Sequence, residues 1–466
     1  MASLPVGAAV EDAPTGPAAV TAGRARRRPA DLGPKLLAGA ALVLLAGSLV
    51  LTAIVRAPQL SLLDEWTHAD YAYRISHGEV PADGDAISRE IREEWSCHRL
   101  APGGDIPPCG QPDPPPADYT AEGQQYNSFH PPVYYAITGV LARAIDAVRP
   151  GLTFITAARL VGLGWLLAGM AVFYLALRRF EVGWPYAAAG VALLPLTPIV
   201  LHASSTVTND AAAALAGSLA LLVLARVLVQ RRTGWLLPAA ATLFVSGTKM
   251  LNGLPMLVVA GLLGVLAIRS WRERDRATAR SLAVLALVIV GTFLAAYLAW
   301  SLYQASRGDP NWVNPVLGKS GRPVRGLPFD EIFSTSFTGF SLTSSYYLQP
   351  LINGQGITAW AKLLSALVVA SPFVALAAFR PWRPAWLVGA GLLAGMLLYP
   401  LAVELQVYLS FGRYFPQVVV RYGMSFIPWA LAVLVMLAAT RRAWRTGAAV
   451  LGMGTLLVAG TVTGVL

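Results

Sequence analysis

The sequence LLDEWTHADYAYR, residues 62–74, follows closely on the first long apolar stretch of the chain, 35–56. It places two adjacent acids, Asp64 and Glu65, where a chain leaving a membrane meets water. In a helix, Asp64 and His68 would share one face because they are four residues apart. The stretch therefore predicts a polar, acidic surface at a membrane exit.

Composition identifies the class of protein. Of the 466 residues, 55% are hydrophobic and only 13% are charged, whereas a soluble domain carries about 25% charged residues. The net charge of +11 comes from short basic clusters between apolar segments. Such clusters are typical of membrane topology and not of a nucleic-acid surface. We therefore expect a polytopic protein of the lipid bilayer with no nucleic-acid partner.

Windows of about 20 apolar residues are long enough to cross a bilayer as helices. Eleven such windows follow one another, at 35–56, 152–177, 184–203, 209–229, 234–248, 250–268, 281–303, 358–379, 384–405, 423–440 and 446–465. The sequence thus predicts an all-α bundle of about 11 transmembrane helices over residues 35–466. Residues 1–34, which are rich in Ala, Pro and Gly and contain RARRR, are expected to form a disordered basic cytoplasmic tail.

One further stretch, 131–148, is ambiguous because it is short and contains Arg143 and Asp146. If it lies on the membrane surface as an amphipathic helix, every basic cluster falls on the side of the N-terminal tail. Those clusters are at 178–179, 231–232, 269–280, 380–383 and 441–445. This arrangement obeys the positive-inside rule at each loop. We therefore predict that the N-terminus is inside and the C-terminus outside.

The polar residues then gather on the outer face. The first outer loop, 57–151, carries thirteen acids between residues 57 and 130, and a second large outer loop covers 304–357. Cys97 and Cys109 both lie in the first loop. In an oxidising compartment a disulfide between them is the leading interpretation, ahead of a metal site. The sequence lacks zinc-ligand spacing and a P-loop, so we expect no required metal or cofactor.

The first outer loop supplies the candidate base. A carboxylate of Asp64, or alternatively of Glu65, is suited to take a proton from an acceptor hydroxyl, although both acids are also typical of a solvated helix cap. His68 is a candidate for orienting the base or binding phosphate, or is a surface histidine. In the segment NSFHPPVYY, 127–135, His130 and Tyr134 are either an interfacial anchor or one wall of a lipid-facing groove.

Cations near the outer ends of spans are candidates for phosphate binding. Lys249, in GTKMLNG, either reaches the surface or holds a lipid phosphate. Arg413, Arg421 and Tyr422 lie in the last outer loop and either anchor it at the interface or bind phosphate. The phosphate interpretation is favoured because outer arginines run against the positive-inside trend and a guanidinium suits phosphate oxygens. Two other acidic sites have expected structural roles: Asn209–Asp210 is favoured as a helix cap, and Glu404 is expected to pair with one of the outer arginines.

Taken in order, these motifs resemble those of the bacterial GT-C-fold membrane glycosyltransferases. This group includes protein O-mannosyltransferases and the aminoarabinose transferase of lipid A. The motifs are DEWTH at 64–68, HPPVYY at 130–135, TND at 208–210, Lys249 between two spans, and RYGMSFIP at 421–428. The resemblance covers most of residues 35–440. It implies a GT-C-like fold with juxtamembrane helices in the first outer loop.

The resemblance also implies an activity. Members of the group transfer a sugar from a polyprenyl-phosphate carrier on the extracytoplasmic face, usually with inversion. Asp64 would then be the base, with Glu65 second, and Lys249 and Arg421 would hold the phosphate. Many relatives carry a soluble domain after the last span, where this chain has the apolar segment 446–465, so the outer loops are expected to recognise the acceptor glycan, glycolipid or protein. The implied location is the bacterial inner membrane, with the site facing outward.

Two other functions are weighed against this one. A polysaccharide polymerase or ligase would use a diphosphate-linked glycan and Arg and His residues of a late outer loop, but 304–357 contains no His. A lipid or solute transporter would show internal repeats and charged residues near the middle of its spans. The ionisable residues here gather at the outer ends instead, which favours the transferase.

Overall fold

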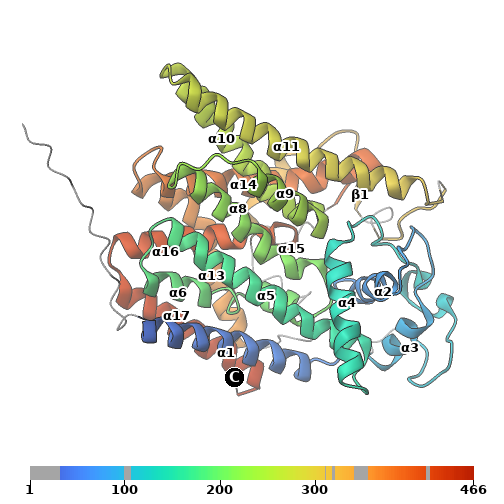
Figure 1. Cartoon of the computed structure of the whole chain (residues 1–466). Helices are drawn as coiled ribbons and strands as arrows, with labels where there is room; N and C mark the ends of the chain where they lie inside the picture. The colour runs from blue at the N-terminus through green and yellow to red at the C-terminus, as the bar shows by residue number, and fades with distance from the viewer. Residues whose placement is uncertain are drawn as a thin grey trace, which may run out of the picture.

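The computed structural model describes residues 32–98, 106–309, 311–316, 321–338, 340, 355–415 and 420–465. Over this part of the chain the protein is a bundle of long helices with a smaller helical cap at one end (Figure 1). The expected cytoplasmic tail lies outside the described residues, apart from its last three, which begin α1. Part of the second outer loop, 304–357, lies outside them as well. The expectation of an all-α polytopic membrane protein is confirmed.

Nine helices of the described chain are long and apolar enough to cross a membrane. They are built on α1 (Leu32–Arg56), α5 (Phe154–Arg179), α8 (Ala213–Leu228), α10 (Leu254–Arg272), α11 (Arg276–Ala305), α13 (Gln355–Ala378), α14 (Pro384–Phe411), α16 (Ile427–Thr440) and α17 (Trp444–Thr463). Short 3-10 turns extend three of them at the N-terminus: η4 (Asn209–Ala212) before α8, η5 (Met250–Gly253) before α10 and η7 (Met424–Phe426) before α16.

The two remaining expected spans are helical but shorter. Window 184–203 is divided into α6 (Trp184–Ala192) and α7 (Pro198–Ser205), because Pro195 and Pro198 have no backbone N–H to continue the helix. Window 234–248 forms α9 (Leu236–Thr248), whose 13 residues rise about 20 Å, less than the roughly 30 Å of a bilayer core. Polar residues are buried at both places: Thr197 between α6 and α7, and Lys249 directly after α9.

The ambiguous stretch 131–148 forms α4 (Val133–Val148), which lies across the end of the bundle beside α2 (Glu65–Ser76), as expected for a juxtamembrane helix (Figure 1). The two helices touch closely: a Cβ on Gly139 would lie 2.0 Å from the carbonyl oxygen of Ala72. Only glycine permits this contact. The cap thereby fixes α2, and with it the acidic pair, over the bundle.

Smaller elements complete the outer end. The first loop contains α3 (Arg89–Cys97), η2 (Pro116–Asp118) and η3 (Thr120–Gly123), and Cys97 and Cys109 form a disulfide. The later outer segments contain α12 (Phe329–Thr338), α15 (Val420–Gly423) and a two-stranded antiparallel sheet of β1 (Arg322–Pro323) and β2 (Arg413–Tyr414).

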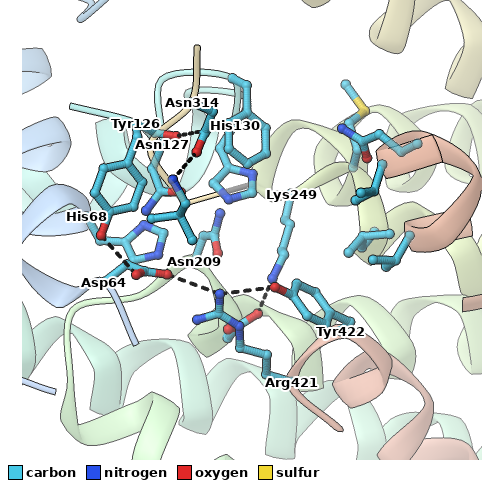
Figure 2. Close-up of a pocket in the computed structure, with 18 of the residues that line it drawn as sticks. Asp64, His68, Tyr126, Asn127, His130, Asn209, Lys249, Asn314, Arg421 and Tyr422 are labelled. Atoms are coloured by element: carbon cyan, nitrogen blue, oxygen red, sulfur yellow. Dashed lines mark hydrogen bonds and ion pairs between the residues drawn. The ribbon is translucent and has the colours of Figure 1, made fainter. Parts of the chain in front are cut away.

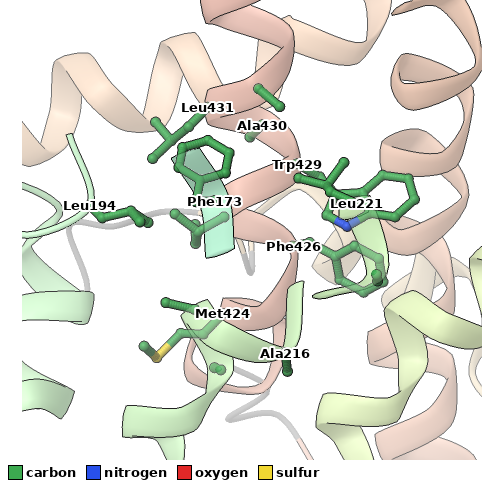
Figure 3. Packing of buried hydrophobic residues seen from close by; sticks show 14 of the residues in the cluster. Phe173, Leu194, Ala216, Leu221, Met424, Phe426, Trp429, Ala430 and Leu431 are labelled. Atoms are coloured by element: carbon green, nitrogen blue, oxygen red, sulfur yellow. The ribbon is translucent and has the colours of Figure 1, made fainter. Parts of the chain in front are cut away.

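The core brings the last outer turn against α8. Figure 3 shows Phe173, Leu221 and Trp429 from α5, α8 and α16 packed in one apolar cluster. The Trp429 indole N–H donates to the carbonyl of Gly217 at 3.2 Å. A Cβ on Gly217 would lie 1.9 Å from the carbonyl oxygen of Ser425, so glycine is required there too. This packing places the turn that carries Arg421 beside the start of α8.

Basic loops that are far apart in sequence share the opposite end of the bundle. The guanidinium of Arg269, at the end of α10, lies 4.8 Å from the ring centroid of Trp382, between α13 and α14. This is the side expected to face the cytoplasm. The orientation of the bundle in the membrane stays a prediction.

Candidate active site

A cavity of about 530 Å³ opens where the cap meets the bundle. One end is polar and charged, and is lined by Asp64, His68, Tyr126, His130, Asn209, Asp210, Lys249, Arg421 and Tyr422. The other end is mostly apolar, and is lined by Met250, Leu251, Tyr297, Trp300, Val403, Val407, Phe411 and Phe415 from η5, α11, α14 and the segment after β2. The shape suits an amphiphile with a polar head and an apolar tail.

Asp64 lies at the polar end with both oxygens engaged (Figure 2). Oδ1 accepts a hydrogen bond from the Tyr126 hydroxyl at 3.0 Å, and Oδ2 accepts one from Arg421 at 3.1 Å. Its backbone is left-handed, with φ 62° and ψ 25°, at the first turn of α2. This conformation is uncommon except for Gly, Asn and Asp. The chain therefore bends at this residue and turns its carboxylate into the cavity.

Glu65, the alternative base, does not line the cavity. Both of its oxygens accept hydrogen bonds from Arg159 of α5, at 2.7 and 2.8 Å, and backbone N–H groups of Ser61 and Val207 donate to it as well. Burial alone would raise the pKa of Glu65, but Arg159 and the backbone donors outweigh it and hold the pKa below its ordinary value. The structure assigns Glu65 to a buried ion pair, because adjacent helical residues point in different directions.

Lys249 and Asp210 form a second buried ion pair, facing the cavity. The side chain of Lys249 is only 4% exposed, so it does not reach the membrane surface. Burial pulls the pKa of Lys249 down, in part against the attraction of Asp210. The interpretation of Asp210 as part of a helix cap was wrong. The Thr208 hydroxyl caps this turn by accepting from the Asp210 N–H at 3.3 Å, which frees the Asp210 carboxylate for Lys249.

Only one of the two outer arginines reaches the cavity. Arg421 donates to Asp64 and to the Tyr422 hydroxyl, the latter at 3.2 Å. Arg413 lies on β2 and donates to the carbonyl of Gly321 at 3.2 Å, outside the cavity, because the pairing of β1 with β2 holds it there. Among the described residues Glu404 pairs with no arginine, contrary to expectation. It is buried in α14 and accepts from the Phe415 N–H at 3.1 Å.

The histidines of the cap line the cavity beside Asp64. His68 and His130 stack with ring centroids 5.9 Å apart, and Nδ1 of His68 lies 2.8 Å from the Tyr135 hydroxyl. Burial lowers the pKa of His68 to about 4, although Asp64 opposes this shift, so the ring is neutral near pH 7. Tyr134 lies behind the cavity wall, where its hydroxyl accepts from the Thr208 N–H at 3.1 Å.

The low pKa of His68 predicts acid sensitivity. The unfolded chain, with a histidine pKa of 6.5, binds a proton that the folded chain excludes until about pH 4. The free energy of unfolding should therefore fall as pH drops from 6.5 toward 4, by about 3 kcal/mol at most from this residue. Thermal unfolding in detergent at several pH values should show a smaller pH dependence for His68→Gln than for wild type or for His77→Gln, an exposed control. Equal slopes for all three proteins would contradict the assignment.

Five residues used in describing the site were not selected from the sequence. Arg159 is a charge inside an apolar span, which is a signal for a structural or functional role. Asn209 and Asp210 were both assigned to a cap, and Tyr134 was selected in place of its neighbour Tyr135. Tyr126 gave no signal, because the long loop that carries it folds back onto α2 only through tertiary contacts, such as the hydrogen bond from Gln125 to the carbonyl of Thr67 at 2.9 Å.

The fold and the cavity define a polytopic helical membrane protein with a buried charged site beside an apolar groove. No protein-family model and no curated protein matches the chain. Among solved structures, it is similar to ArnT from Cupriavidus metallidurans bound to undecaprenyl phosphate, with 18% identity and a TM-score of 0.46, covering 87% of this chain and 61% of that one. The apo ArnT structure gives 17% identity and a TM-score of 0.34, over 86% of this chain and 78% of that one. The function proposed below rests on the side chains of the cavity.

Proposed function

We propose that the protein is a membrane glycosyltransferase. It moves a sugar from a polyprenyl-phosphate donor to a hydroxyl of an extracytoplasmic cell-envelope glycan, glycolipid or protein. The observation that carries the proposal is the placement of the Asp64 carboxylate beside two cations, Arg421 and Lys249, in one cavity that continues into an apolar groove. Such a cavity matches a lipid phosphate that bears a reactive group.

The groove accommodates the lipid part of the donor. Tyr297 and Trp300 of α11 face the cavity, as do Val403 and Val407 of α14. Tyr297 is 43% exposed, so the groove opens toward the surface that the bilayer covers. An isoprenoid chain needs only apolar contact and gains about 25 cal/mol for each Å² it removes from water.

The cations accommodate the phosphate. Arg421 and Lys249 each already face a carboxylate, Asp64 and Asp210 respectively. A phosphate entering between them would share these cations and would draw Arg421 away from Asp64. The carboxylate would then be free to act on the acceptor at the moment the donor is in place.

The chemistry is a single displacement. Asp64 takes the proton from the acceptor hydroxyl, and the acceptor oxygen attacks the anomeric carbon of the sugar. The bond from that carbon to the phosphate oxygen breaks, and the lipid phosphate leaves with the electron pair, stabilised by Arg421 and Lys249. In-line attack inverts the anomeric centre. These steps assign no role to a metal, and the expectation that none is required stays a prediction.

The two outer arginines provide a matched test. In membranes, wild type is assayed for transfer from labelled polyprenyl-phosphate mannose and arabinose. Arg421→Met should weaken donor binding by about 10- to 100-fold, because a hydrogen bond to a charged group contributes about 1.5–3 kcal/mol. Arg413→Met should stay within about twofold of wild type, because Arg413 lies outside the cavity. Equal losses in both variants, or no turnover of any donor by the folded protein with acceptor membranes present, would count against the proposal.

A further inference from the structure

A buried hydrogen-bonded chain runs behind the polar end of the cavity. The Tyr135 hydroxyl lies 2.8 Å from Nδ1 of His68 and 3.1 Å from Nδ2 of Asn209. The exposed fractions of His68, Tyr135 and Asn209 are 3%, 0% and 1%. His68 and Asn209 line the cavity, whereas Tyr135 does not. Figure 2 shows Asn209 in the middle of the polar end, between His68 and Lys249.

We assign the directions of these hydrogen bonds from the donors and acceptors that the groups carry. The Asn209 amide nitrogen can only donate, so the Tyr135 oxygen accepts from it. The Tyr135 proton is then available for Nδ1 of His68. With Nδ1 accepting that proton, a neutral His68 ring carries its own proton on Nε2, and no other side chain of the described chain is bonded to that nitrogen. His68 therefore presents an N–H donor on the side away from Tyr135.

The other end of the chain presents an acceptor. Oδ1 of Asn209 is buried and has no hydrogen-bond partner among the described residues. A buried polar atom without a partner is costly, and such atoms in a cavity wall often await a ligand or an ordered water. His68 and Asn209, which both line the cavity, thus carry a donor and an unsatisfied acceptor, and both contact the same tyrosine hydroxyl.

A phosphate alone does not satisfy this pair. An ionised phosphate has only acceptor oxygens, which Arg421 and Lys249 serve, and it would be repelled by Oδ1 of Asn209. A sugar hydroxyl both donates and accepts. We propose that Nε2–H of His68 and Oδ1 of Asn209 bind hydroxyl groups of the transferred sugar, with Tyr135 as the positioning residue that fixes both. This inference rests on the proposed function and assigns the sugar to the side of the cavity formed by the cap.

The placement agrees with the rest of the site. His68 lies one helical turn after Asp64, and the His68 amide donates to the Asp64 carbonyl at 3.2 Å. A sugar held by His68 and Asn209 would therefore lie next to the base, with its phosphate toward Arg421 and Lys249. Its anomeric carbon would then stand between the base and the cations, as the displacement requires.

The test compares two tyrosines of one aromatic stack. Tyr71 and Tyr135 stack with ring centroids 3.8 Å apart, but the Tyr71 hydroxyl donates to the backbone carbonyl of His130. Binding of undecaprenyl phosphate is measured beside binding of undecaprenyl-phosphate mannose and arabinose. Tyr135→Phe should weaken binding of the better sugar-bearing lipid by about tenfold, and should leave undecaprenyl phosphate within about twofold. Tyr71→Phe, the control, should change neither.

Each outcome bears on the inference. If Tyr135→Phe weakened the binding of both kinds of lipid equally, or of neither, the inference would be overturned. It would also be overturned if wild type bound the sugar-bearing lipids no more tightly than undecaprenyl phosphate. If the sugar-dependent loss of binding is seen but no transfer occurs, the proposed function fails while this site stands.

A ligand-free readout is the imidazole ¹⁵N spectrum, in which the His68 signals are assigned by comparison with His68→Gln. Wild type should show an unprotonated Nδ1 that shifts in Tyr135→Phe but not in Tyr71→Phe, and a protonated Nδ1 in wild type would also overturn the inference.

Discussion

Asp64→Asn is expected to lower the rate of sugar transfer by about 10²- to 10⁴-fold, the usual contribution of a positioned general base. Asparagine keeps the shape of the side chain but cannot accept the proton of the acceptor hydroxyl. Binding of undecaprenyl phosphate should persist or become tighter, because Arg421 loses the carboxylate that now competes for it at 3.1 Å. Single-turnover transfer and lipid binding, measured on the same preparation, separate the two effects.

The control is another carboxylate that lines the cavity. Asp83 comes from the same outer loop and pairs with the Ser128 hydroxyl, away from Arg421. Asp83→Asn should therefore reduce transfer by less than about tenfold, a loss below the 10²-fold expected for the base. If Asp83→Asn abolished transfer while Asp64→Asn retained it, the base would have to be reassigned. A loss of donor binding in Asp64→Asn equal to its loss of rate would mean that Asp64 holds the substrate and does not accept the proton.

Arg159→Met is expected to destabilise the protein by about 3–5 kcal/mol, the typical cost of leaving one partner of a buried ion pair uncompensated. The Arg159 and Glu65 side chains are 2% and 1% exposed. Arg159 also donates to the backbone carbonyls of Ala57 and Gln59, which link α1 to α2, at 2.9 and 2.7 Å. Its loss should therefore loosen the bend that presents Asp64. The measurement is denaturant or thermal unfolding in detergent micelles.

A surface arginine supplies the comparison. Arg89 is 58% exposed and pairs with Glu90 and Glu93, so Arg89→Met should cost at most about 1 kcal/mol. The double variant Glu65→Gln/Arg159→Met should recover part of the stability lost in Arg159→Met, because it no longer buries an unpaired charge. If Arg89→Met and Arg159→Met were equally mild, the buried pair would have no structural role. If the double variant were the least stable, the loss would come from packing and not from charge.

Much of the fold could be predicted from the sequence because the bilayer restricts what an apolar chain can do. Each of the eleven apolar windows contains at least one helix in the described chain, and the charges within 131–148 correctly favoured a juxtamembrane helix, which is α4 (Figure 1). The predictions were less successful where proline or chain length limits a helix, as at Pro195 and Pro198 and in the 13 residues of α9. Hydrophobicity alone reports neither effect.

The site could be predicted only in part. Asp64, His68, His130, Lys249, Arg421 and Tyr422, six of the nine candidate catalytic or binding residues, line one cavity. Glu65, Tyr134 and Arg413 do not, and in each case a partner distant in sequence decides the position: Arg159, Thr208 and Gly321 respectively. Side-chain chemistry gave the right types of residue, but could not give the direction in which each one points.

The sequence by itself determined the class of protein and the gathering of its polar residues at one end of the bundle, because those follow from local hydrophobicity and charge. The tertiary structure alone decided which acid faces the cavity, which arginine joins it, and that Tyr135 links His68 to Asn209. These choices depend on contacts between residues 67 to 357 positions apart in the chain. Burial makes such contacts strong, since an unpaired polar group inside the protein costs more than one in water.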